Sequence, residues 1–201
     1  MLSVSCNSAR RDAVSRWFRS TALLMLGVVG SATAQSVQVD IPGPPGSSAF
    51  GTTVTVLPSG NIVVSDPTAA PSNAGAVHVY SPGGELLSSL VGNPEDRVGS
   101  GGVSALADGN FVVRSPLWAS AGAATGRGAV TWVNGTTGLA ATVSAANSLV
   151  GSAVTDRVGS DGVVALPNGS YLVRSGLWTN NGASNAGAVT WVPASGALFG
   201  E

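Results

Sequence analysis

A segment that begins with Asp96-Arg97-Val98-Gly99-Ser100 recurs almost unchanged 60 residues later, from Asp156 to Ser160. Each copy continues with Val-Arg-Ser, then Leu-Trp, and then Gly-Ala-Val-Thr-Trp-Val, and a more divergent copy precedes both from Phe50 onward. Near-identical segments in tandem fold into near-identical units that stack on their neighbours. The repeats therefore predict an architecture, and packing is the first explanation for any residue found in every copy.

Each copy contains short runs of β-branched and aromatic residues separated by glycine turns, which is typical of β-strands. Asp108-Gly109 and Asn168-Gly169 favour hairpins with type I′ turns, in which both central residues have positive φ. The expected strands are 54–57, 62–65, 76–80 and 85–91, then 103–107, 111–115, 129–133 and 140–145, then 163–166, 171–175 and 188–192.

These strands form three expected units of four antiparallel strands, at residues 50–95, 96–155 and 156–201, the last one truncated. Units of this length match the blades of a β-propeller, which closes with about four to eight blades. We therefore predict an all-β fold of propeller-like blades in an incomplete propeller. The favoured explanation is a fragment or truncated gene product, and the alternatives are closure with other chains or a different arrangement of the sheets.

The N-terminal residues 1–34 are predicted to be a signal peptide. Four arginines precede an apolar run at 22–29, and Ala32-Thr33-Ala34 is a small-x-small cleavage pattern. The run is shorter than the roughly 20 residues that span a bilayer. Residues 35–49, which contain several prolines and glycines, predict an extended lead-in. We expect an exported protein, secreted, periplasmic or on the cell surface, with no membrane insertion after cleavage.

Removal of the signal peptide would leave five arginines and nine acidic residues, a net charge of −4, with no basic stripe. Nucleic acid is therefore not expected as a partner. The single cysteine, Cys6, precedes the apolar run, so we expect neither a lipid anchor nor a disulfide in the mature chain.

The repeated polar residues are interpreted as structural. His78 is the only histidine, and the expected mature chain has no cysteine, so no Cys/His dyad or zinc site can be assembled. A Ser-His-Asp triad is formally possible, but no nucleophile-elbow motif is found and the other copies carry Thr131 and Thr190 in place of His78. Asp96 and Asp156 could suggest the paired carboxylates of a glycosidase. We instead expect them to accept backbone N–H groups while Arg97 and Arg157 bridge to an adjacent unit. No catalytic, cofactor-binding or metal-binding residue is predicted, and the protein is not expected to be an enzyme.

Arginines and tryptophans also recur in phase. Arg114 and Arg174 are expected to stack on an indole or to pair with the repeated aspartates. The tryptophans are expected to fill the space between sheets, with a carbohydrate-stacking surface as the alternative; they are Trp118, Trp132, Trp178 and Trp191. The loops 119–127 and 179–186 differ between copies, and variable loops on a rigid scaffold are where recognition is expected.

The first copy resembles the FG-GAP repeat of integrin-α-type β-propellers, on Phe50-Gly51, Val63 to Pro67 and Gly75 to Tyr80. The second and third copies resemble an uncharacterised tandem repeat of bacterial secreted and adhesin-like surface proteins. The integrin-type calcium loop is not matched, because each hairpin turn holds at most one carboxylate and calcium takes six to eight oxygens.

The predicted function is that of an exported surface interaction or adhesion module without catalysis or cofactor. Its partner would be an unknown protein or carbohydrate ligand, and self-association through the open C-terminal edge is a further expectation. The alternatives are a periplasmic propeller enzyme of quinoprotein type, suggested by the tryptophans and the Thr137-Gly138 turn, and a non-functional fragment of a larger repeat protein.

Overall fold

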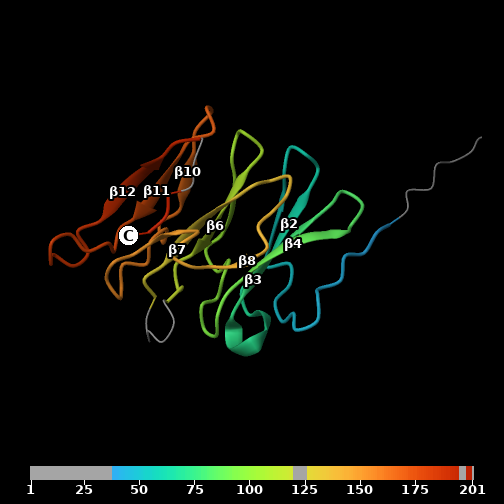
Figure 1. The fold of residues 1–201 in the computed structure, drawn as a ribbon, viewed down its shortest axis with the longest axis horizontal. Helices are drawn as coiled ribbons and strands as arrows, with labels where there is room; N and C mark the ends of the chain where they lie inside the picture. The colour runs from blue at the N-terminus through green and yellow to red at the C-terminus, as the bar shows by residue number, and fades with distance from the viewer. Residues whose placement is uncertain (1–37, 120–125, 195–197, 201) are drawn as a thin grey trace, which may run out of the picture. The chain divides into compact units, whose positions relative to one another are not determined.

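The computed structural model describes residues 38–119, 126–194 and 198–200, which belong to one compact unit. The predicted signal peptide lies outside the described residues. Three open sheets account for nearly all the regular structure, which confirms the all-β prediction of propeller-like units (Figure 1).

The first sheet contains β1 (Thr53–Val56), β2 (Ile62–Asp66), β3 (Ala76–Tyr80) and β4 (Leu86–Val91), and the two-residue strand β8 (Ala141–Thr142) is added at its edge. An irregular turn, η1 (Ala69–Asn73), connects β2 to β3. The second sheet contains β5 (Gly102–Ala105), β6 (Phe111–Ser115), β7 (Ala129–Val133) and β9 (Leu149–Val150). The third contains β10 (Val163–Ala165), β11 (Tyr171–Ser175) and β12 (Ala188–Val192).

The hairpin turns differ from the expected type. Only the glycine of each turn has positive φ, at Gly60, Gly109 and Gly169, whereas a type I′ turn needs two such residues. In the second sheet, Gly109 N–H donates to Leu106 O at 3.2 Å, and Leu106 N–H donates to Asn110 O at 2.8 Å. This is a longer loop closed by a left-handed glycine, so the type I′ prediction was wrong.

Strand pairing follows one register in all three sheets, which makes positions directly comparable. Ile62, Phe111 and Tyr171 pair with Tyr80, Val133 and Val192 respectively. At the other end of the same strands, Asp66, Ser115 and Ser175 pair with alanines. Residues at the same register position are called equivalent below.

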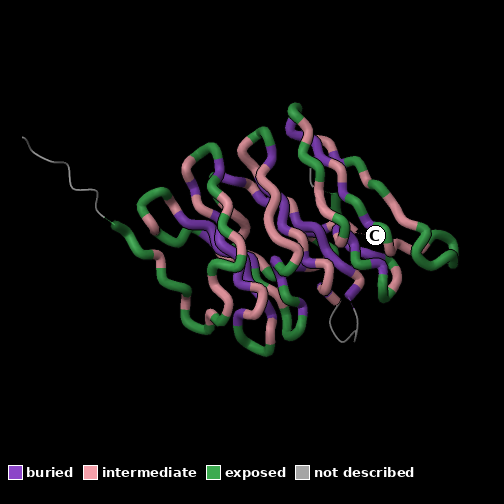
Figure 2. The backbone as a smooth tube through the Cα atoms, turned by 180° about the vertical axis from the view of Figure 1, so that it is seen from behind, coloured by how far each residue is buried: buried purple, intermediate pink, exposed green. Residues whose placement is uncertain are grey.

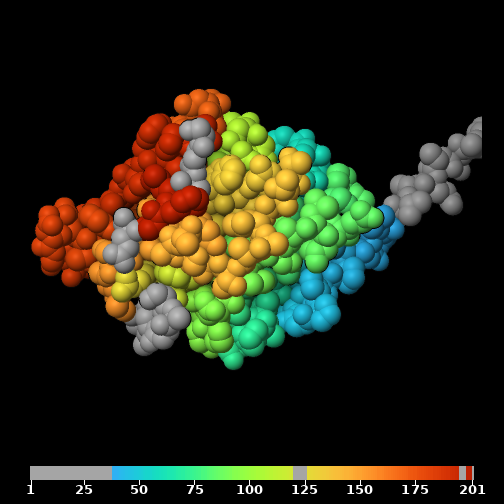
Figure 3. Space-filling model, in the orientation of Figure 1, coloured from blue at the N-terminus to red at the C-terminus, as the bar shows by residue number. Residues whose placement is uncertain are grey.

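The strand expected at 140–145 pairs differently from the prediction. β8 does not join β7; it lies parallel to β4 at the edge of the preceding sheet, with Leu90 opposite Ala141. In the space-filling view the gold part of the chain borders the green part to which β4 belongs (Figure 3). The place beside β7 is taken by β9 instead. The same crossing recurs one unit later, where Gly200 pairs in parallel with Leu149. A segment of each later unit therefore pairs with the fourth strand of the preceding sheet and joins the two units.

The apolar core lies between successive sheets. We call the face that a sheet turns to the preceding sheet its upstream face, and the opposite face its downstream face. Val63, Val77 and Val79 on the downstream face of the first sheet pack on the upstream face of the second, where Phe111, Val113 and Val133 lie. Val112 and Val130 pack in the same way on Tyr171, Val173 and Val192. Fully burying one such side chain contributes about 1.5–3 kcal/mol.

The outer faces at the two ends of the stack differ in how far they are covered. The lead-in covers the upstream face of the first sheet, where Phe50 packs on His78 and Tyr80, each with ring centroids 6.0 Å apart. Ser48 and Ala49 donate their N–H groups to Asp66. By contrast, exposure alternates along β12, and Val189 and Trp191 on its downstream face are 66% and 55% exposed (Figure 2).

Candidate interaction site

His78 links two strands of the first sheet. Its Nδ1 lies 2.8 Å from Ser89 Oγ, and the side chain is 6% exposed. Burial lowers the pKa of His78, while the charge of Asp66 acts in the opposite direction. In the second sheet the equivalent Thr131 makes the same contact with Ser148, at 2.7 Å between hydroxyl oxygens. His78 therefore occupies a structural position that a threonine fills elsewhere.

The repeated aspartates hold loops, as expected. Asp96 accepts N–H groups from Asn93 at 2.7 Å and from Ala119 at 3.2 Å. Asp156 accepts those of Ala153 at 2.8 Å and Thr179 at 3.0 Å. Burial raises the pKa of Asp96, and its hydrogen bonds oppose that shift. Each carboxylate thus ties the segment before a sheet to the loop that leaves the second strand of that sheet.

The bridge between units is made by a different arginine from the expected ones. Arg97 and Arg157 are exposed, and Arg97 pairs with Glu95 of its own loop at 4.0 Å. Arg114 instead reaches the next unit, where its Nη1 donates to Gly159 O at 3.2 Å. Burial lowers the pKa of Arg114, and the charge of Arg174 adds to the effect.

The tryptophans divide into buried and exposed ones. Trp118 is 4% exposed within the first core, and Trp132 and Trp178 are partly buried against the second. Packing between sheets is therefore confirmed for these three. Trp191 is largely exposed, because no sheet among the described residues covers the downstream face of the third sheet.

The loop between β11 and β12 is the candidate interaction site. Its stem is fixed by Asp156, which binds Thr179, and by Gly187 N–H, which donates to Trp178 O at 3.0 Å. Its tip, Asn180 to Ala186, is exposed throughout. Asn180 and Ala183 exchange two backbone hydrogen bonds, which close a tight turn within the tip. The tip presents amide and hydroxyl groups, which suit hydrogen bonding to a polar partner.

The corresponding stem in the second unit has the same construction. Gly128 N–H donates to Trp118 O at 2.9 Å, and Asp96 binds Ala119. The residues 120–125 of that loop lie outside the described part of the chain. The sequence predicted where the loops are, but it did not show how the aspartates fix them.

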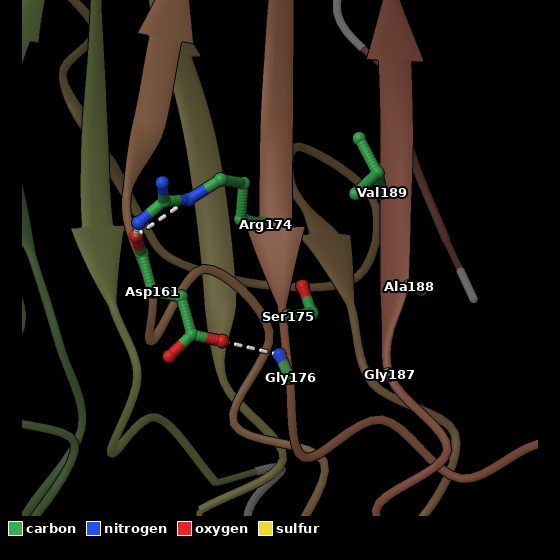
Figure 4. A pocket seen from close by; sticks show the side chains of 7 residues that line it. All are labelled: Asp161, Arg174, Ser175, Gly176, Gly187, Ala188 and Val189. Atoms are coloured by element: carbon green, nitrogen blue, oxygen red, sulfur yellow. Dashed lines mark hydrogen bonds between the residues drawn. The ribbon is translucent and has the colours of Figure 1, made fainter.

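Two hollows flank the third sheet. One, of about 410 Å³, lies on the downstream face between Asp161, Arg174 and Val189 (Figure 4). The other, of about 300 Å³, lies between Trp178, Thr190 and Phe199 and is mainly apolar. Within residues 38–119, 126–194 and 198–200, no three His, Cys, Asp or Glu side chains are grouped as a metal site would require. In the same ranges, no helix has the length and hydropathy needed to cross a membrane.

Comparison with known proteins identifies the repeat but not an activity. Residues 105–160 and 165–201 match the family model described as "Repeat of unknown function (DUF5650)". The match covers two copies, in agreement with the two closely similar segments. No curated protein matches the chain.

Proposed function

We propose that the protein is an exported, non-catalytic interaction module that binds a polar surface partner, a protein or a carbohydrate, through the loop between β11 and β12. The observation that carries the proposal is the combination of a fixed stem and an exposed tip. Recognition commonly resides on loops that a rigid scaffold positions. The FG-GAP resemblance of the first unit remains a prediction that agrees with such a role.

The polar residues elsewhere support an interaction role over catalysis. The carboxylates of Asp96 and Asp156 accept hydrogen bonds from backbone N–H groups, and His78 is hydrogen-bonded to Ser89. Each of these contacts has a counterpart in another unit, so each is explained by the construction of the repeat. By contrast, no hydrogen bond among the described residues joins the tip of the loop between β11 and β12 to a neighbouring sheet.

The proposal can be tested with the full chain immobilised on a sensor surface. Defined probes would be passed over it: soluble chitin, cellulose and starch oligosaccharides, gelatin and fibrinogen. Binding of at least one probe is expected, and replacing residues 180–186 by a Gly-Ser segment of equal length should weaken it at least about tenfold.

A matched control replaces Pro167 and Asn168, which are exposed at the hairpin tip between β10 and β11, with glycine and serine and should leave probe binding unchanged. Absence of binding by every probe, or equal binding by the loop-replaced chain, would contradict the proposal.

A further inference from the structure

The downstream face of the third sheet repeats the one that the second sheet buries. On the second sheet, that face carries Val112, Arg114, Val130 and Trp132. The equivalent residues of the third sheet are Leu172, Arg174, Val189 and Trp191. Both faces thus carry the same sequence of side-chain types, yet only the first of the two is covered by a further sheet.

On the second sheet, the covering unit is anchored by its loop from Arg157 to Gly159, which binds the backbone before β7. We call this backbone position, at the glycine before β7, the seat of the loop. Val158 N–H donates to Arg127 O at 3.0 Å, and a β-carbon on Gly128 would stand 2.2 Å from Val158 N. Gly159 packs on Val130, and its carbonyl accepts from Arg114. The same seat exists one unit earlier, because Val98 N–H donates to Ala74 O and Gly75 makes the same close approach to Val98.

The third sheet has the seat without the loop. The hollow on this sheet is lined by Arg174, Gly187 and Val189 (Figure 4). On the second sheet, the equivalent residues contact the loop from Arg157 to Gly159. A β-carbon on Gly187, the equivalent of Gly128, would meet nothing closer than Gly176 O at 3.5 Å. The guanidinium of Arg174 turns back instead, and its Nε donates to Asp161 O at 2.8 Å.

In the described part of the chain, the third sheet also lacks the fourth strand that the first two sheets have. β3 is followed by β4 and β7 by β9, whereas β12 has no fourth strand beside it among the described residues. In the first sheet Ser89 of the fourth strand bonds His78, and in the second sheet Ser148, directly before the fourth strand, bonds Thr131. Thr190 is the equivalent residue on β12, and it lies at the apolar hollow.

We propose that the downstream face of the third sheet and the edge of β12 form a docking site for a further unit of this same repeat. The unit would add a Ser-Leu-Val-Gly strand to β12, place an Arg-Val-Gly loop over Gly187, and cover Val189 and Trp191 with its upstream face. The two internal interfaces supply the geometry of each of these contacts.

A second copy of this chain fits the site less well. Its own Arg-Val-Gly loops are used within its own stack. The upstream face of its first sheet is covered by the lead-in, and that face carries Asp66 and His78 where the following sheets carry serine and threonine. The partner is therefore expected to present the small residues of the later units.

The test uses the full chain and a synthetic peptide with the sequence of residues 143–160, which contains both the edge strand and the loop. Binding should protect the β12 amides from hydrogen exchange and shift tryptophan emission to the blue as Trp191 is covered. A peptide of scrambled sequence should do neither. Gly187→Ala should weaken binding at least about tenfold, because its new methyl group would occupy the place of the incoming backbone.

Gly109→Ala is the matched control, because Gly109 also has positive φ but no neighbour within 4 Å, and it should bind as the unchanged protein does. To remove the effect of weak affinity, the same 18-residue segment is also attached directly after Glu201. Protection of β12 in that chain, abolished by Gly187→Ala, is the expected result. Lack of protection both with the free peptide and with the attached segment would overturn the proposal. So would a dimer, detected by sedimentation, in which tryptophan emission shows that Trp191 is covered and to which the peptide does not bind.

Discussion

Gly128 and Val158 lie backbone to backbone, so close that a β-carbon on Gly128 would stand 2.2 Å from the nitrogen of Val158. Gly128 also has a φ of 78°, a conformation that L side chains rarely adopt. Gly75 and Val98 repeat the relationship one unit earlier. The glycine of the repeated Gly-Ala-Val segment is therefore the point at which one unit accepts the next.

Gly128→Ala is expected to lower the free energy of unfolding by about 2–5 kcal/mol. Left-handed backbone costs an alanine about 1–2 kcal/mol, and overpacking against backbone adds about 1–3 kcal/mol. Gly187→Ala should cost only the first of these, because its surroundings are open. Urea unfolding of both variants measures the difference, and equal losses would show that the close contact is not what requires glycine.

His78 should make stability depend on pH below neutrality. Burial lowers its pKa in the folded protein, so the unfolded chain binds the proton first as the pH falls. The contribution is fully present above the unfolded pKa of about 6.5 and is lost as the pH falls through the lower folded value. Thermal unfolding between pH 7.5 and 5 should therefore show a falling melting temperature.

His78→Thr provides the control for this effect, since threonine is found at the equivalent positions and can bond Ser89 as Thr131 bonds Ser148. The variant should lose the part of the pH dependence near pH 6 while keeping that of the carboxylates. An unchanged profile would show that His78 does not titrate with unfolding.

The strands of the fold were predictable because packing in each unit uses the same alternation of side chains. Phe111, Val113 and Val133 share one face, and their equivalents Tyr171, Val173 and Val192 do the same. Recurrence also predicted correctly that Asp96 and Asp156 hold backbone groups. A residue kept in every copy can be interpreted from any one of them.

Contacts between units could not be predicted in the same way. Nothing local distinguishes a strand that pairs with β7 from one that crosses to β4, so the pairing of Ala141 with Leu90 was missed. The role of Arg114 depends on where Gly159 of the next unit lies. The role of Asp66 likewise depends on the lead-in, whose proline-rich sequence predicts an extended chain but not the face that it covers.

Tyr171 should make the protein sensitive to alkali. Burial raises the pKa of Tyr171 to about 12, from an ordinary value of 10.0. Since the unfolded chain releases this proton first, the contribution is fully present below pH 10 and is lost as the pH rises through about 12. At about 1.4 kcal/mol for each pKa unit, the complete loss amounts to about 2–3 kcal/mol.

Tyr171→Phe should remove that part of the alkaline loss, and phenylalanine is the residue at the equivalent position 111. Urea unfolding at pH 9, 10 and 11 gives the comparison. Burial also raises the pKa of Tyr80, so a smaller alkaline effect should persist in the variant and be reduced further by Tyr80→Phe. Parallel profiles for Tyr171→Phe and the unchanged protein would contradict the prediction.

Asp156 should determine whether the loop between β11 and β12 keeps its conformation. Its buried carboxylate accepts N–H groups from Ala153 and Thr179, and an asparagine can accept only with its one oxygen while its amide group faces the other donor. Asp156→Asn should therefore cost about 1–3 kcal/mol, and hydrogen exchange should rise at Thr179 and through the tip. Asp108→Asn is the matched control, because Asp108 accepts from Asn110 at an exposed turn, where water replaces a lost bond. A similar cost for both substitutions, or unchanged exchange at the tip, would mean that the loop is held by Gly187 and Trp178 alone and that the aspartate serves the preceding segment.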